Sequence, residues 1–133
     1  MIQPARIHVR FSDLDILGHV NNAIYLSYFE IARVHYFGQL LGIEWDWKHY
    51  TVVLVKNEVE YLKPVLLHEE VYVHMNVTHI GEKSFTLTYE LKVNGETRTK
   101  GGSTLVAYDA EAHRTMPIHP EMKNALEHLK SEQ

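Results

Sequence analysis

Two aspartates, a histidine and two asparagines lie directly before a strongly apolar segment in residues 11–33, FSDLDILGHVNNAIYLSYFEIAR. A carboxylate such as Asp13 or Asp15 can act as a general base or a nucleophile, and His19 could be its acid–base partner. The unpaired amides at a helix start carry roughly half a positive charge and can stabilise an oxyanion. The stretch could therefore attack a carbonyl group, although aspartates before a helix are more commonly caps or turn residues.

A long helix is predicted directly after these polar residues. Residues 23–41 contain no proline and one glycine, and Gly42 is a plausible C-cap. Asn21 or Asn22 is the natural N-cap, because a short side-chain oxygen can accept a hydrogen bond from the first free amides. Apolar residues cover most of the circumference, which predicts that the helix is buried inside the protein.

Most of the remaining sequence alternates between polar and apolar residues, as strands do. Asn-Gly at 94–95 predicts a tight hairpin, and Pro120 opens a short amphipathic helix. The pattern predicts an α+β protein in which a curved antiparallel sheet, a meander after the first strand, wraps around one long central helix. This arrangement is called the hot dog fold, here a single domain over residues 1–133. The predicted strands are residues 7–11, 51–62, 70–80, 83–93 and 97–109.

Composition excludes several classes of protein. The formal net charge of −4 gives no broad basic surface for nucleic acid, and the absence of cysteine excludes disulfides, thiolate metal sites and a cysteine nucleophile. No apolar run approaches the length of a membrane span, and the N-terminus does not resemble a signal peptide. We therefore expect a soluble, cytoplasmic protein that binds neither nucleic acid nor membrane.

The segment VRFSDLDILGHVNNAIYLSYFEIAR resembles the opening motif of the 4-hydroxybenzoyl-CoA thioesterase-like family of acyl-CoA thioesterases. That motif has an acid and an aspartate, then Gly-His-Val-Asn-Asn, and then Tyr-Leu in an aromatic-rich helix. The later segments EVEYLKPV and GEKSFTL also resemble parts of the family's sheet, so the resemblance covers most of the chain.

The resemblance implies hydrolysis of an acyl-CoA thioester to a free acid and coenzyme A, without a metal ion or bound cofactor. It implies that Asp15 is the catalytic carboxylate and that the backbone amide at or near Asn22 holds the oxyanion. It also implies a homodimer or homotetramer with active sites at the subunit interface. The residues support this mapping, because a short loop bent at Gly18 could place a carboxylate and free amides around one carbonyl group. The sequence leaves two mechanisms open: Asp15 attacks the carbonyl carbon directly, or it deprotonates a water molecule that attacks. The water mechanism is preferred.

Three nearby residues have structural alternatives. Asp13 is predicted to be a turn residue or a loop brace. His19 is predicted to pin the loop through hydrogen bonds, with acid–base catalysis as the alternative. Tyr25 lies one turn beyond Asn22 and could line the acyl pocket, although a buried aromatic residue on such a helix more commonly belongs to the core.

Glu30 is the alternative catalytic carboxylate. A related subgroup of hot dog thioesterases places a catalytic glutamate on the long helix, about two turns past its start, and Glu30 lies near that position. An isolated acid among apolar neighbours is unfavourable unless it is paired or functional. Arg33 lies three residues further along, so an intrahelical ion pair is the preferred interpretation.

Coenzyme A carries phosphates, so we expect positive charge near its binding site. Lys83 in GEKSF is the predicted CoA-binding residue, because it resembles a position where a relative uses basic residues. The neighbouring Glu82 departs from that relative's more basic run. Arg98 and Lys100 on the following strand are further candidates, and each of these cations could equally be an ordinary surface residue.

Two other functions are compatible with the same fold. A hydratase or dehydratase could use Asp15 with His19, although those enzymes carry a differently spaced acid–histidine motif. A non-catalytic acyl-CoA-binding or sensing module has little use for a carboxylate beside a bound carbonyl group. The chain lacks HExxH and GxSxG motifs, which argues against a zinc protease and a serine hydrolase.

Overall fold

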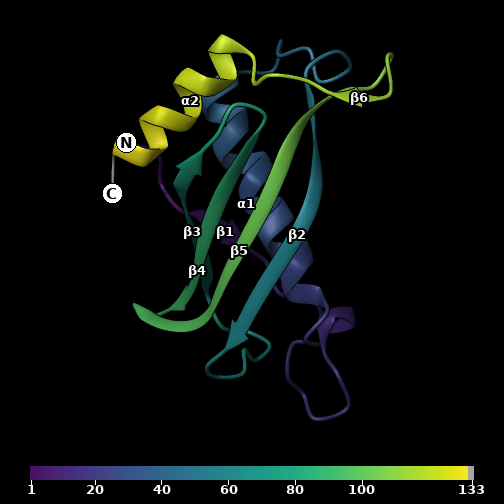
Figure 1. Cartoon of the computed structure of the whole chain (residues 1–133). Helices are drawn as coiled ribbons and strands as arrows, with labels where there is room; N and C mark the ends of the chain where they lie inside the picture. The colour runs from purple at the N-terminus through teal and green to yellow at the C-terminus, as the bar shows by residue number, and fades with distance from the viewer. Residues whose placement is uncertain (132–133) are drawn as a thin grey trace.

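A computed structural model describes residues 1–131 of the chain (Figure 1). Besides a short 3₁₀ turn at Phe11–Asp13, it contains two helices and six strands. In chain order these are β1 (Ala5–Ile7), α1 (Ile24–Leu41), β2 (Thr51–Tyr61), β3 (Val71–Ile80), β4 (Ser84–Val93), β5 (Glu96–Asp109), β6 (Arg114–Thr115) and α2 (Pro120–Ser131). No helix among the described residues is long and apolar enough to cross a membrane.

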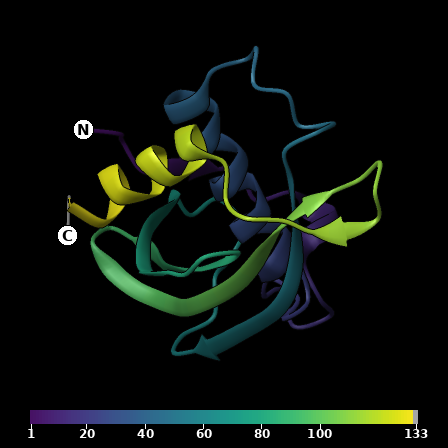
Figure 2. The ribbon, with the colours of Figure 1, turned by 45° about the horizontal axis from the view of Figure 1, so that its top comes forward.

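The sheet is antiparallel, with strand order β1-β3-β4-β5-β2, and the short β6 pairs with β5. It curves around α1 (Figures 1 and 2), while α2 contacts β3 and α1. This confirms the predicted hot dog fold. The tight turn at Asn94 and Gly95 is also confirmed, since both residues have positive φ and Val93 pairs with Glu96.

The predicted meander is wrong at one strand. β2 does not pair with β3, which follows it in sequence, but lies beside β5 at the edge of the sheet. Residues 62–70 form a connection that contains Pro64 and contacts the loop before α1, where the Val20 amide donates to the Val65 carbonyl at 2.8 Å. This connection carries the chain across the sheet instead of closing a hairpin.

The first strand also differs from its prediction of residues 7–11. β1 covers Ala5–Ile7, which pairs with Val71 to Val73 of β3. The chain then turns into the 3₁₀ segment, because the Asp13 side chain accepts the backbone amide of Arg10 at 3.0 Å. The polar–apolar alternation therefore continues beyond the paired residues.

The Phe29 ring of α1 packs directly against Gly101 of β5. A Cβ atom at this position would overlap the Phe29 ring, which is stacked on Tyr89 of β4 with 4.4 Å between ring centroids. Glycine is therefore required here by the contact between helix and sheet. At the other end, Gly42 has φ +81° and ends the helix as predicted.

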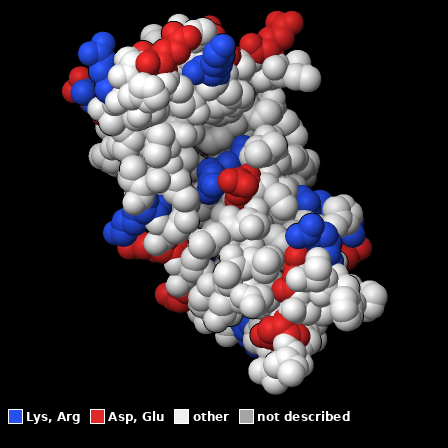
Figure 3. All heavy atoms as spheres, turned by 90° about the vertical axis from the view of Figure 1, so that its right-hand side faces the viewer, with Lys and Arg blue, Asp and Glu red and all other residues white. Residues whose placement is uncertain are grey.

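One side of α1 and the outer edge of β2 are not covered within the described chain. The prediction of a helix buried on nearly all sides is therefore only partly correct for the single chain. The side of the molecule that carries β2 is mostly uncharged (Figure 3). The exposed apolar side chains of these two elements include Val53, Leu54 and Val55 of β2 and Leu26, Ile31 and Val34 of α1.

Candidate active site

The loop before α1 is a small hairpin. Leu14 and Val20 form an isolated antiparallel bridge, and the Asp15 amide donates to the His19 carbonyl at 2.7 Å. Gly18 has φ +79° and donates its amide to the Asp15 carbonyl at 3.1 Å, so it supplies the predicted bend. The loop therefore presents Asp15 on a defined backbone.

The two carboxylate oxygens of Asp15 differ. Oδ1 accepts the backbone amides of Leu17 at 2.9 Å and His19 at 3.2 Å. Within the described part of the chain, no group donates a hydrogen bond to Oδ2, and the residue is exposed. One oxygen is thus held by the loop and the other is available to a substrate or a water molecule.

The start of α1 leaves one amide available. The Asn21 side chain accepts the Ala23 amide at 2.9 Å, and the Asn21 carbonyl accepts the Ile24 amide at 2.9 Å. The N-cap residue is Ala23, so the prediction that Asn21 or Asn22 is the N-cap is wrong. The Asn21 side chain nevertheless accepts a backbone amide at the start of the helix, as a capping side chain does. Among the residues described, nothing accepts from the Asn22 amide.

Tyr61 at the end of β2 fixes the same peptide segment. Its hydroxyl donates to the Asn22 carbonyl at 2.6 Å, and its ring packs edge-on against Tyr25 at 5.2 Å between centroids. Tyr25 is buried and also contacts Tyr28, so its contacts within the chain are those of a core residue. Burial raises the pKa of the Tyr61 hydroxyl, which therefore remains a donor.

Asp13 is the buried carboxylate of this region, with 1% of its surface exposed. Oδ2 accepts the Tyr28 hydroxyl at 2.7 Å and the Arg10 amide at 3.0 Å, and the Arg10 guanidinium binds Oδ1 at 3.0 Å. Burial opposes its ionisation, but these hydrogen bonds and the Arg10 charge outweigh burial, so the pKa of Asp13 lies below its usual value. These contacts are those of a brace.

His19 pins the loop through its backbone. Its carbonyl and amide bond the backbone and side chain of Asp15, and it bridges to Leu66. No hydrogen bond joins its ring to the Asp15 carboxylate in the described structure. The arrangement gives no support to an Asp15–His19 acid–base pair.

Glu30 lies elsewhere, on the exposed side of α1. Its carboxylate is 71% exposed and 3.9 Å from Nη2 of Arg33, whose Nη1 donates to the Tyr89 hydroxyl at 2.9 Å. Both residues border a groove of about 590 Å³ between α1 and β2. The rest of the groove is mainly apolar and includes Val34, Phe37, Ile43, Trp47, Val52 and Leu54.

The candidate CoA-binding cations are not brought together. Lys83 is exposed in the turn between β3 and β4, and its carbonyl accepts the Ala107 amide at 2.8 Å. Arg98 is occupied, with Nη2 of its guanidinium 2.9 Å from Glu69 and Nη1 2.8 Å from the Pro64 carbonyl.

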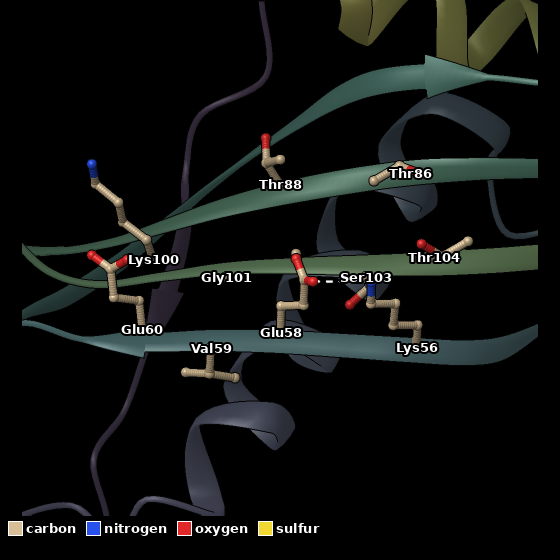
Figure 4. A pocket seen from close by; sticks show the side chains of 11 residues that line it. Lys56, Glu58, Val59, Glu60, Thr86, Thr88, Lys100, Gly101, Ser103 and Thr104 are labelled. Carbon is tan, nitrogen blue, oxygen red and sulfur yellow. Dashed lines mark ion pairs between the residues drawn. The ribbon is translucent and has the colours of Figure 1, made fainter.

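Lys100 borders a separate hollow of about 770 Å³ on the outer face of the sheet (Figure 4). Thr86 and Thr88 of β4 line the same hollow, in which Lys56 is 3.0 Å from Glu58. No group of three or more metal-ligating side chains is arranged to hold a metal ion among the described residues.

Sequence reasoning did not identify Tyr28 and Tyr61 as part of this region. Tyr28 is 15 residues from Asp13, and Tyr61 is 39 residues from Asn22. Neither spacing has a local signature, because each contact depends on how the loop, α1 and β2 meet in space.

Comparisons with known proteins identify the family of the chain. A family model described as the thioesterase-like superfamily matches residues 9–126. The uncharacterized protein YsmA of Bacillus subtilis is 30% identical over 94% of this chain and 85% of its own length. The long-chain acyl-CoA thioesterase FadM of Escherichia coli is 25% identical, covering 93% of this chain and 96% of FadM. A Thermus thermophilus thioesterase, solved with coenzyme A and zinc, is 38% identical with a TM-score of 0.82, covering 95% and 92% of the two chains.

Proposed function

The chain belongs to the thioesterase-like superfamily, and we propose that it hydrolyses acyl-CoA thioesters to a free acid and coenzyme A. One structural observation is the main support for this proposal. The Asp15 carboxylate is tied to its loop through Oδ1 alone, just before a helix start at which the Asn22 amide has no acceptor in the described chain. A free carboxylate oxygen and a free amide are the two groups that attack on a carbonyl requires.

The roles of these groups follow from the charges that develop. Oδ2 of Asp15 takes a proton from water as the water oxygen attacks the thioester carbon, or it attacks that carbon itself. In both routes the carbonyl oxygen becomes negative, and the Asn22 amide would donate to it with support from the helix dipole. In the water route the carbon–sulfur bond then breaks to give the free acid, and the proton on Asp15 passes to the sulfur, so that coenzyme A leaves as the thiol. In the direct route the carbon–sulfur bond breaks to leave a mixed anhydride on Asp15 and a thiolate that takes a proton from water. A second water molecule then hydrolyses the anhydride, which releases the free acid and restores the carboxylate.

The open edge of β2 supports assembly of two copies with the site at their interface. The 11-residue strand β2 pairs with β5 on one side only, and another strand can pair with its outer edge, where Val53, Leu54 and Val55 are exposed. Two β2 strands paired antiparallel would place the start of one beside the end of the other. The apolar groove of one copy would then adjoin Tyr61 and the Asp15 loop of its partner, where it could take an apolar acyl group.

The position of Lys83 supports the same assembly. Ser84, which follows it, pairs with Val106 of β5, whereas Tyr61 pairs with Thr99. These positions on β5 are seven residues apart, roughly 23 Å at about 3.3 Å per residue. Lys83 therefore lies at the far end of the sheet from the Asp15 loop of its own chain, and would contact coenzyme A at the site of a second copy.

A panel of acyl-CoA thioesters with thiol release as the readout tests the function. We expect cleavage by the unmodified protein, with apolar acyl groups preferred because the groove is apolar. The same panel should be titrated by calorimetry. Tight binding of a thioester without thiol release would assign the chain to acyl-CoA binding or sensing, and absence of both would contradict the proposed substrate class.

A further inference from the structure

Asp13 is a buried carboxylate that neither route to hydrolysis uses. Its side chain accepts hydrogen bonds from the Arg10 amide, the Arg10 guanidinium and the Tyr28 hydroxyl. Its backbone is also occupied, since its carbonyl accepts the Asn21 amide at 2.8 Å and its amide donates to the Arg10 carbonyl at 2.9 Å. A buried charge with this many partners is strongly fixed in place.

These contacts connect the two halves of the candidate site. Through Tyr28, Asp13 is attached to α1 just beyond its first turn, and through the Asn21 amide it is attached to the residue before Asn22. Asp13 also lies two residues before Asp15, at the base of the hairpin that presents it. The entry and the exit of that hairpin are therefore both held by one residue.

Within the described chain, the hydrogen bond from Tyr28 to Asp13 is the one that joins this loop to a side chain of α1. The hydrogen bonds of Asp15 are all made within its own loop, to Leu17, Gly18 and His19. They set the shape of the loop but not its position against the start of α1. The position of the Asp15 carboxylate relative to the Asn22 amide thus depends on the links from Asp13 together with the backbone contacts of the hairpin.

We propose that Asp13 and Tyr28 are positioning residues for thioester hydrolysis, which hold the Asp15 carboxylate and the Asn22 amide on either side of the scissile carbonyl. This inference rests on the proposed function. A displacement of about 1 Å between reacting groups can cost on the order of 10²-fold in rate, so loosening this link should slow the chemical step. Substrate binding should change little, because neither side chain is available to a ligand.

Tyr28→Phe is the sharpest test, because it removes one hydroxyl and keeps the buried ring. Tyr89→Phe is the matched control. Tyr28 and Tyr89 are each 2% exposed, and each hydroxyl donates to a buried side chain, Asp13 at 2.7 Å and Ser103 at 2.9 Å. We expect kcat to fall about 10-fold or more in Tyr28→Phe with KM unchanged. Tyr89→Phe should lower the unfolding temperature by a similar amount and leave kcat unchanged.

The double variant Asp15→Asn/Tyr28→Phe distinguishes a role of Tyr28 in positioning Asp15 from a non-specific loss of activity. If Tyr28 acts through Asp15, its removal should lower kcat no further once the carboxylate is gone, so the two effects should not multiply. Equal kcat values for the unmodified protein and Tyr28→Phe, with thioester cleavage intact, would overturn the positioning role alone. Failure of the unmodified protein to cleave any thioester would instead overturn the proposed function, and the positioning role with it.

Discussion

The two ends of α1 are built in opposite ways. At its N-terminal end, buried and charged groups are linked by short hydrogen bonds, from Arg10 through Asp13 to Tyr28. Towards its C-terminal end, α1 borders an open apolar groove that includes Phe37 and Trp47. Glu30 and Arg33 form the charged pair at the border of this groove, and their side chains are 3.9 Å apart. One end is suited to holding reacting groups in fixed positions, and the other to receiving an apolar group of variable shape.

The separation of these ends bears on assembly. Fifteen residues separate Asn22 from Phe37, about 22 Å along the helix axis. A short acyl group bound at Asn22 cannot reach that part of the groove in the same chain. Antiparallel pairing of two β2 edges would instead bring the reactive end of one copy beside the groove of the other. The contrast between the ends therefore favours a site shared by two copies.

The largest expected effect is at the reactive end. Asp15→Asn keeps the shape of the side chain and an oxygen for the Leu17 and His19 amides, but removes basicity and nucleophilicity. We expect kcat to fall by about 10² or more, with the unfolding temperature nearly unchanged. Asp109→Asn is the matched control, because the Asp109 side chain also accepts two amides in a turn, at 3.0 and 3.1 Å. Within one chain it lies at the opposite end of the sheet from Tyr61 and the Asp15 loop.

The fold was largely predictable because its signals are local. Burial alternates along β3 and β4 in the way the sequence alternates. The predicted boundaries of these two strands differ from the observed ones by one residue at most. The place of β2 was not predictable in this way. Whether a strand joins the neighbour that follows it depends on the path of residues 62–70, which is fixed by contacts such as that of Val65 with Val20.

The candidate reactive residues could be named from the sequence, whereas the residues that support them could not. Asp15 and Asn22 belong to a compact motif whose resemblance to a known family indicated them, and their catalytic roles stay predictions. The residues that hold them are contributed by the helix interior and by the far end of β2. Tyr28 looks like any other apolar position of α1 in the sequence, and only the fold shows that its hydroxyl meets Asp13.

A smaller effect on the kinetics is expected from Lys83, which lies at the end of the sheet opposite to Tyr61. Lys83→Ala should raise KM several-fold and leave kcat nearly unchanged, because contacts to the phosphates of coenzyme A are made before and during the reaction. Lys123→Ala, an exposed lysine on α2, serves as the control. An unchanged KM for several thioesters would assign Lys83 to ordinary surface.

Mixing two variant chains tests whether Lys83 acts at the site of its own copy or at the site of a partner in the proposed dimer. A dimer of one Asp15→Asn chain and one Lys83→Ala chain keeps a single Asp15, on the chain that lacks Lys83. If the site is shared between copies, that Asp15 works with the partner's intact Lys83, and the hybrid should have the unmodified KM. A raised KM in the hybrid would place Lys83 and Asp15 of one chain at the same site.

The smallest expected effect is at Glu30, the other carboxylate on α1. Glu30→Gln removes an exposed ion pair of 3.9 Å, and Arg33 keeps its hydrogen bond to Tyr89, so the loss of unfolding free energy should be about 0–1 kcal/mol. Glu58→Gln is a matched control, since Glu58 is 70% exposed and 3.0 Å from Lys56 on the outer face. We expect kcat to stay unchanged in both variants. If thiol release survives in Asp15→Asn and disappears in a folded Glu30→Gln, the catalytic carboxylate is on the helix, beside the groove, because loss of an exposed ion pair cannot by itself abolish turnover.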